Sequence, residues 1–267
     1  NENAAAFFAL GRIKNTSAPV AVVTTSGTAV AELLPAMVEA HYGGQALVAI
    51  TADRPVTYRG SGAPQSIYQP NIFGNYVTSS FDLKKEDSFE LSDTPQAPLH
   101  INVCFDEPLV DGEFAETVSP EPARTQRFDV ENWQADDWQN FRSSSKNPLI
   151  ILGGLSTDAS RNVKSLLLDW QLPFYAEAHS QLLGDEELQD LRISCGEVLF
   201  KGKFFRDHFD GILRIGSVPT LRLWRDLENK HLDFPVLSVS DAEFSGLSRQ
   251  LQRPIPITPF AKLVKDN

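Results

Sequence analysis

The sequence predicts an α/β protein with two domains, each built on a doubly wound parallel sheet. Three observations carry this prediction. Residues 20–25 and 47–51 are continuous apolar runs rich in β-branched side chains, typical of strands buried on both faces, and a helix-length segment separates them. A strand, a helix and a strand of these lengths form a right-handed parallel crossover. A further apolar run at 148–152 starts the pattern again, and 267 residues suit two compact domains.

The first half of the chain alternates between helical and extended patterns. Residues 2–14 have apolar side chains at helical spacing, with Ala5, Phe8, Ala9 and Ile13 on the expected inner face. The other expected elements are a helix over about 29–42 that stops at Gly43-Gly44, a loop over 53–74, and strands at 77–83 and 99–105.

Residues 113–146 have little periodicity, and we interpret them as a linker between a first domain of residues 1–112 and a second of 147–267. The linker contains a charged, tryptophan-containing helix near 130–141. The second domain is expected to have strands at 148–152, 172–176, 210–216 and 234–240, with helices at 157–170 and about 220–228. Its Gly153-Gly154 is only part of a dinucleotide fingerprint, so a Rossmann-like domain without NAD or FAD is expected.

Composition narrows the functional class. The formal net charge of −11 argues against a nucleic-acid partner, which would need a basic face. Cys104 and Cys195 form neither a disulfide framework nor a zinc spacing, and no other metal-ligand pattern is present, so a reducing, cytoplasmic compartment is expected. No apolar run approaches the ~20 residues that span a bilayer, so we expect no membrane insertion.

Polar residues follow both of the first apolar runs, where parallel sheets usually bind ligands. Ser26, Gly27 and Thr28 form a turn that opens a helix and offers free N–H groups; the alternative is an ordinary cap made by the Ser26 or Thr28 hydroxyl. Arg54 follows the second run, where its guanidinium could bind a substrate carboxylate through two hydrogen bonds, or else pair with Asp53.

Several blocks together resemble thiamine-diphosphate-dependent enzymes, most of all the menaquinone-pathway synthases of that family. The resemblance covers essentially the whole chain, but only about half of such an enzyme. The blocks that carry it are Glu2 to Gly11, Thr25 to Ala29, Thr51 to Pro55, Gly62 to Gln65 and His100 to Val103, with Ala178 to Leu182 and Gly216 to Thr220 as looser matches in the second half.

The resemblance implies a pyrimidine-binding domain followed by the family's central domain. It implies that Glu2 activates thiamine diphosphate by a hydrogen bond to the aminopyrimidine, that Ser26, Gly27 and Thr28 lie under that ring, and that Gln65 lies near the reactive carbon as a catalytic and substrate-binding residue. Glu2 could instead be an ordinary acidic residue in the first turn of a helix. Arg54 and, more loosely, Arg222 would bind substrate; a solvated helix arginine is the alternative for Arg222.

The implied reaction decarboxylates 2-oxoglutarate and adds the succinyl unit to isochorismate. Mg²⁺ or Mn²⁺ would be bound through a C-terminal diphosphate-binding domain that this chain does not contain. A homodimer or homotetramer is implied, and residues 1–267 alone are expected to be inactive. Two alternatives stay open: another decarboxylase or carboligase similar to acetolactate synthase, and a non-catalytic binding module.

Overall fold

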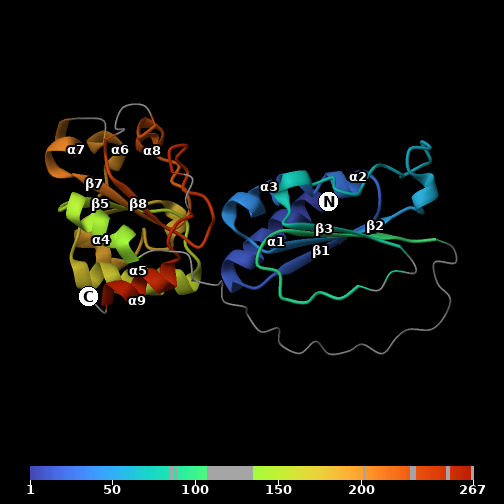
Figure 1. Cartoon of the computed structure of the whole chain (residues 1–267), viewed down its shortest axis with the longest axis horizontal. Helices are drawn as coiled ribbons and strands as arrows, with labels where there is room; N and C mark the ends of the chain where they lie inside the picture. The colour runs from blue at the N-terminus through green and yellow to red at the C-terminus, as the bar shows by residue number, and fades with distance from the viewer. Residues whose placement is uncertain are drawn as a thin grey trace. The chain divides into compact units, whose positions relative to one another are not determined.

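The computed structural model describes residues 1–84, 87, 89–106, 135–200, 203–228, 233–250 and 253–265. The chain divides into two compact units, Asn1–Arg127 and Phe128–Asn267. Each unit contains a four-stranded sheet in which every described strand pair is parallel, with helices packed on the sheet (Figure 1). The predicted α/β class with two parallel sheets is therefore confirmed. No helix within the described ranges is long and apolar enough to cross a membrane.

The first unit has strand order β1-β2-β4-β3. Its elements are α1 (Glu2–Thr16), β1 (Val20–Thr24), α2 (Thr28–Ala31), α3 (Leu34–Gly43), β2 (Leu47–Asp53), β3 (Ser79–Leu83) and β4 (Leu99–Cys104), with short 3-10 turns at Val56–Tyr58 and Gly74–Tyr76.

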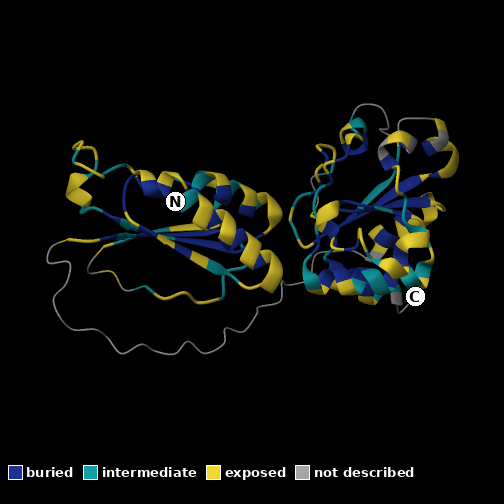
Figure 2. Ribbon diagram, turned by 180° about the vertical axis from the view of Figure 1, so that it is seen from behind, coloured by how far each residue is buried: buried dark blue, intermediate teal, exposed yellow. Residues whose placement is uncertain are grey.

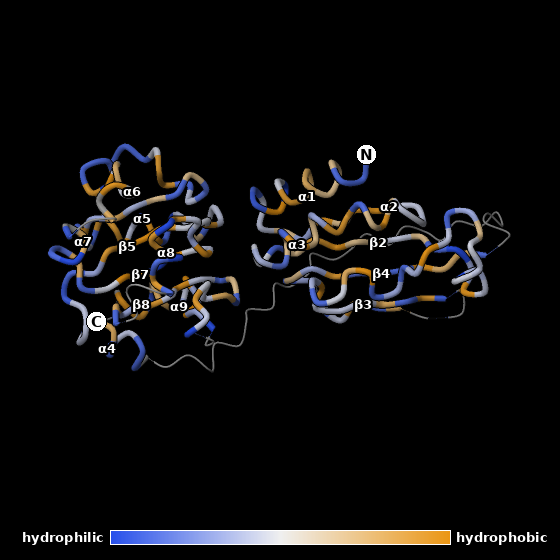
Figure 3. The backbone as a smooth tube through the Cα atoms, turned by 90° about the horizontal axis from the view of Figure 1, so that it is seen from above, coloured by the Kyte–Doolittle hydropathy of each residue, from blue (hydrophilic) through white to orange (hydrophobic). Residues whose placement is uncertain are grey.

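The side chains of β2 alternate between two apolar clusters, as the pleat of a strand requires. Leu47 and Ala49 pack against α1 and α3, whereas Val48 contacts the opposite cluster, which includes Leu99 and Ile101 of β4. The strands β2 and β5 carry hydrophobic colours over much of their length in Figure 3. This pattern explains why a continuous apolar run predicted a strand buried on both faces.

Two predicted helical features differ from the structure. The helix expected over 29–42 is two helices, because Pro35 lacks the N–H that would continue the ladder and instead lies in the first turn of α3. Helix α1 buries Ala6, Ala9, Leu10 and Ile13, and Phe8 on its other side is 73% exposed. The inner face was thus predicted with an incorrect rotation about the helix axis.

The second unit has strand order β6-β5-β7-β8, and its strands are drawn mainly in the buried colour in Figure 2. Its elements are α4 (Ala135–Ser144), β5 (Pro148–Leu152), α5 (Thr157–Trp170), β6 (Phe174–Ala176), 3-10 turns at Ala178–Ser180 and Glu186–Leu191, α6 (Gly196–Leu199), α7 (Lys203–His208), β7 (Gly211–Ile215), α8 (Arg222–Asp226), β8 (Val236–Val239) and α9 (Ile257–Lys265).

The end of the predicted linker belongs to the core of the second unit. Trp138 and Phe141 of α4 are buried in its main apolar cluster, and the Trp138 ring stacks on Trp170 of α5 with centroids 6.0 Å apart. Residues 135–146, predicted as the end of the linker 113–146, therefore pack as part of the second unit, because burying two aromatic rings stabilises α4 there. Residues 107–134, with the predicted boundary at 112, lie outside the described residues.

Candidate functional site

The site is at the carboxyl edge of the first sheet. Strands β1 to β4 are mutually parallel, so Thr24, Asp53, Leu83 and Cys104 all end at this edge. The loop that follows β2 returns across the same edge and carries Gln65. Loops beyond the carboxyl ends of parallel strands are where open α/β sheets bind ligands.

The structure brings Gln65 directly onto the predicted Ser26-Gly27 turn. The Gln65 amide Nε2 donates to the Thr25 hydroxyl at 2.9 Å and to the Ser26 carbonyl at 3.2 Å. A Cβ on Gly27 would lie 3.0 Å from Gln65 Cγ, and Gly27 has φ +84°. Glycine is required here because it adopts this backbone conformation and leaves room for Gln65. Gln65 is exposed, so its amide oxygen Oε1 is accessible to a ligand.

The Gly27 N–H is not free, contrary to the sequence-based expectation. It donates to Oε1 of the buried Gln69 at 2.8 Å. The alternative of a side-chain cap is also wrong, because Gly27 is the N-cap of α2 and no side chain caps that helix. Ser26 is buried and Thr28 is exposed, so of the two hydroxyl residues only Thr28 lies on the surface.

A buried polar network lies on one face of the sheet behind this turn. The Thr51 hydroxyl donates to Asn102 Oδ1 at 2.8 Å and lies 2.9 Å from His100 Nε2. Since the hydroxyl proton is used on Asn102, His100 must donate from Nε2, and its Nδ1 accepts from Ser80 at 3.3 Å. Gln69 Nε2 completes the network by donating to Asn102 Oδ1 at 2.8 Å. The network therefore selects the tautomer of neutral His100 that carries its proton on Nε2.

Burial lowers the pKa of His100 to about 4. In the unfolded chain His100 has a pKa near 6.5 and becomes protonated below that pH, whereas in the folded protein it stays neutral down to about pH 4. The free energy of unfolding therefore falls as pH drops below 6.5, and the loss is complete below pH 4. We expect His100 to contribute a loss of about 2 kcal/mol in the free energy of unfolding between pH 7 and pH 5. Urea unfolding at both pH values checks this, with His100→Gln as the comparison. Equal pH dependence in the two proteins would contradict it.

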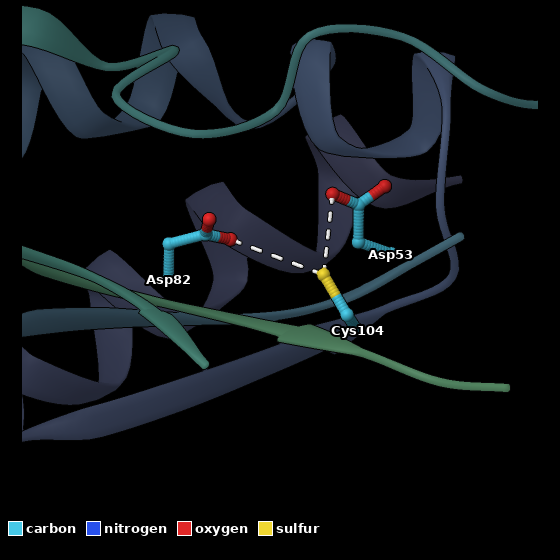
Figure 4. Close-up of side chains that lie close together, drawn as sticks. All are labelled: Asp53, Asp82 and Cys104. Atoms are coloured by element: carbon cyan, nitrogen blue, oxygen red, sulfur yellow. Dashed lines mark hydrogen bonds between the residues drawn. The ribbon is translucent and has the colours of Figure 1, made fainter. Parts of the chain in front are cut away.

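Asp53, Asp82 and Cys104 converge at the ends of β2, β3 and β4 (Figure 4). Their ligand atoms lie within 4.8 Å of one another, a geometry that could hold a metal ion. The Arg59 guanidinium lies among them: its Nη2 is 2.9 Å from Asp53 Oδ2, 2.7 Å from Asp82 Oδ1 and 2.9 Å from Cys104 Sγ. Hydrogen bonds from Arg59 lower the pKa of Asp82. The cation at this cluster is therefore Arg59, and we assign it no metal.

Arg54 and Glu2 are at the same edge of the sheet. The Arg54 N–H donates to Asp53 Oδ1 at 2.8 Å, while its guanidinium makes no hydrogen bond or ion pair to any residue that the structure describes. The ion pair with Asp53 that was considered for Arg54 is made by Arg59 instead. Glu2 is half-buried in the first turn of α1, and the neighbouring Asn3 amide donates to the Glu32 carbonyl just after α2 at 3.2 Å.

Arg222 belongs to the second unit, at the first residue of α8. Its side chain is 53% exposed and pairs with Asp226 at 3.1 Å. Thr220, two residues before Arg222, lines a pocket of about 690 Å³ together with Glu177 and His179. Glu177 Oε1 accepts from the Thr220 N–H at 2.7 Å and from its hydroxyl at 2.6 Å. Arg222 does not line that pocket, and the substrate role of Arg222 stays a prediction.

Several residues of the site were not predicted from the sequence, among them Gln69, Asn102 and Arg59. The signal for Asn102 was present, because His100, Asn102 and Cys104 alternate with three apolar residues on β4. Polar side chains at every second position of a buried strand indicate that one face carries a hydrogen-bond network. Nothing comparable marked Gln69 or Arg59, which come from the returning loop.

Comparison with known proteins agrees with this geometry. Residues 1–72 match the family model described as "Thiamine pyrophosphate enzyme, N-terminal TPP binding domain". This segment includes Glu2, the Ser26-Gly27 turn, Arg54, Gln65 and Gln69. The chain belongs to the thiamine-pyrophosphate enzymes.

Over most of its length the chain is similar to 2-succinyl-5-enolpyruvyl-6-hydroxy-3-cyclohexene-1-carboxylate synthases. It is 44% identical to the synthase of Bdellovibrio bacteriovorus over 256 residues, which cover 94% of this chain and 48% of that protein. It is 41% identical to the Akkermansia muciniphila synthase over 260 residues, 93% of this chain and 46% of that protein. The chain spans about half the length of these curated relatives.

Proposed function

We propose that the protein containing this chain decarboxylates 2-oxoglutarate and adds the resulting succinyl unit to isochorismate, a step of menaquinone biosynthesis. The observation that carries the proposal is the exposed Gln65 amide bonded to the Thr25–Gly27 turn, within the segment that matches the thiamine-pyrophosphate family. The relatives' name supports the substrate pair, since it describes a succinyl group joined to a cyclohexene carboxylate.

The residues at the carboxyl edge fit thiamine diphosphate by their chemistry. The Glu2 carboxylate makes no hydrogen bond or ion pair with any described residue, so it is available to share a hydrogen bond with a ring nitrogen. Gly27 has no Cβ, so Gln65 can lie directly against the turn that would face the ring. Bound thiamine diphosphate would supply the nucleophilic carbon and the electron sink that decarboxylation needs.

The protein's own residues then bind and orient the reactants. Glu2 would hold or share a proton at the aminopyrimidine ring. Gln65 would contact the substrate beside the turn; both N–H groups of its amide are used on Thr25 and Ser26, so donating to a substrate carboxylate would require it to give up one of these hydrogen bonds. Arg54 supplies a guanidinium at the sheet edge for one of the two carboxylates that each substrate carries. A substrate contact from Arg222 also stays part of this proposal.

The remaining parts of the proposal concern partners. Mg²⁺ or Mn²⁺ would bind through a diphosphate-binding domain outside this chain, and a homodimer or homotetramer in the cytoplasm would complete the site. Residues 1–267 alone should therefore show no turnover. Measurable turnover by this chain alone would refute that part of the proposal.

Arg54→Gln is expected to raise KM for 2-oxoglutarate about 10- to 100-fold, because it removes a charge-assisted pair worth roughly 1.5–3 kcal/mol. Consumption of 2-oxoglutarate is measured in the full-length gene product with thiamine diphosphate and Mg²⁺, with and without isochorismate. Arg12→Gln, an exposed arginine on α1, is the control and should behave as wild type.

The alternatives give different results in the same assay. Turnover of pyruvate without turnover of 2-oxoglutarate would assign the protein to the acetolactate-synthase-like alternative and leave Arg54 without its role. Absence of turnover with either acid, in a protein that folds, would support the non-catalytic module.

A further inference from the structure

Gln69 is a fully buried glutamine whose amide makes three hydrogen bonds to three different segments. Its Oε1 accepts from the Gly27 N–H at 2.8 Å, and its Nε2 donates to the Ala52 carbonyl at 2.9 Å and to Asn102 Oδ1 at 2.8 Å. We propose that Gln69 is a positioning residue that sets the geometry of the Thr25–Gly27 turn and, through it, of Gln65. This inference rests on the proposed function, because the turn is assigned there to the cofactor.

The turn is contacted on two sides by one short segment. Gln65 bonds to the Thr25 hydroxyl and the Ser26 carbonyl on the exposed side, and Gln69 bonds to the Gly27 N–H on the buried side. Gln65 has φ +60°, a conformation that costs a non-glycine residue about 1–3 kcal/mol unless the surroundings enforce it. A shift of Gln69 would therefore move both the turn and the residue that lies on it.

The polarity of the Gln69 amide is determined by its neighbours. Asn102 Nδ2 donates to Asp53 at 3.0 Å and to Asp82 at 2.8 Å, so its Oδ1 must face Gln69. Oδ1 accepts only, and the Ala52 carbonyl accepts only, so Gln69 must present its NH₂ to both and its oxygen to Gly27. A side chain at position 69 therefore needs an acceptor and a donor at defined places. Glutamine meets this requirement, whereas a carboxylate of the same shape lacks the donor.

The test uses Gln69→Glu and Gln69→Met in the full-length gene product. Gln45, a second buried glutamine of this unit at the opposite, amino end of β2, gives the matched controls Gln45→Glu and Gln45→Met. Three quantities are measured well below the unfolding temperature: the Kd of thiamine diphosphate by calorimetry, kcat, and KM for 2-oxoglutarate.

We expect kcat to fall about 10- to 100-fold in both Gln69 variants, since small displacements of reacting groups have effects of this size. KM for 2-oxoglutarate should stay within about threefold of wild type because Arg54 is unchanged, and the Kd of thiamine diphosphate should rise. In Gln69→Glu the loss of kcat should shrink as pH is lowered from 8.5 to 6. Burial favours the protonated carboxyl, which can accept from Gly27 and donate to Asn102.

Two results would overturn the proposal: losses of kcat and cofactor affinity no larger than in the Gln45 controls, or a Gln69→Glu profile with the pH dependence of wild type. Failure of the proposed function gives a separate result, because wild type would then not turn over 2-oxoglutarate. The Kd of thiamine diphosphate would still report the effect of Gln69 on the turn in that case.

Discussion

Glu2→Gln is expected to lower kcat of the full-length gene product by about 10²- to 10⁴-fold, the range of a lost general acid–base group. The amide keeps the size of the side chain but cannot take up or share a proton as the carboxylate does. The substitution should hardly change the fold, because the Glu2 carboxylate forms no hydrogen bond or ion pair within the part of the chain that the structure describes. Loss of the favourable interaction with the helix dipole costs only about 0.3–1 kcal/mol.

Glu32→Gln is the matched control for that experiment. Glu32 is exposed, and only its backbone carbonyl contacts the start of α1, through Asn3. The control should keep wild-type kcat, with 2-oxoglutarate consumption as the measurement at saturating thiamine diphosphate. If the Glu2→Gln enzyme keeps wild-type kcat, Glu2 is not a catalytic residue. The alternative interpretation, an ordinary acidic residue in the first turn of a helix, would then hold.

Arg59→Met is expected to lower the free energy of unfolding by about 3–5 kcal/mol, the usual cost of removing one partner of a buried ion pair. The side chain of Arg59 is 13% exposed, and those of Asp53 and Asp82 are 0% and 31% exposed. Without the guanidinium, two carboxylates face each other at the end of the sheet with no cation between them. Urea unfolding followed by circular dichroism measures the change.

The pH dependence of that loss has a defined sign. The hydrogen bonds from Arg59 lower the pKa of Asp82 in the folded protein. The stabilisation by ionised Asp82 is therefore fully present above the pKa that Asp82 has in the unfolded chain, and it is lost as pH falls through the lower pKa of the folded protein. The difference between wild type and Arg59→Met should therefore be largest near neutral pH and shrink in acid. Arg161→Met, which breaks an ion pair exposed by 72% and 78%, should cost less than about 1 kcal/mol. A similar small loss for Arg59→Met would mean that the cluster contributes little to stability.

The strands were predictable because buried parallel strands are short, continuous and β-branched, and their boundaries agree within about two residues for β1, β2 and β4. The place of the site followed from the same rule, since polar residues after Thr24 and Asp53 had to meet at one edge. Gln65 could be placed near the turn by resemblance alone; the structure adds the contacts to Thr25 and Ser26.

The buried network could not be derived in this way. The choice of Arg59 over Arg54 as partner of Asp53 depends on how the loop after β2 returns over the sheet, which local sequence does not determine. The error in predicting the inner face of α1 has a similar cause. Ala5 and Ala6 differ by about 100° around the helix, and packing against α3 and the sheet selects Ala6.

All four tryptophans of the sequence lie after residue 132, and the stacked pair Trp138–Trp170 is inside the core of the second unit. Intrinsic fluorescence excited at the indole band therefore reports on residues 128–267 and is silent for Asn1–Arg127, whose aromatic side chains are phenylalanine and tyrosine. Substitutions such as Arg59→Met can then show whether the two units unfold together. If the tryptophan emission transition shifts to lower urea along with the circular dichroism transition, the units unfold cooperatively. If the emission transition keeps its midpoint, each unit unfolds by itself.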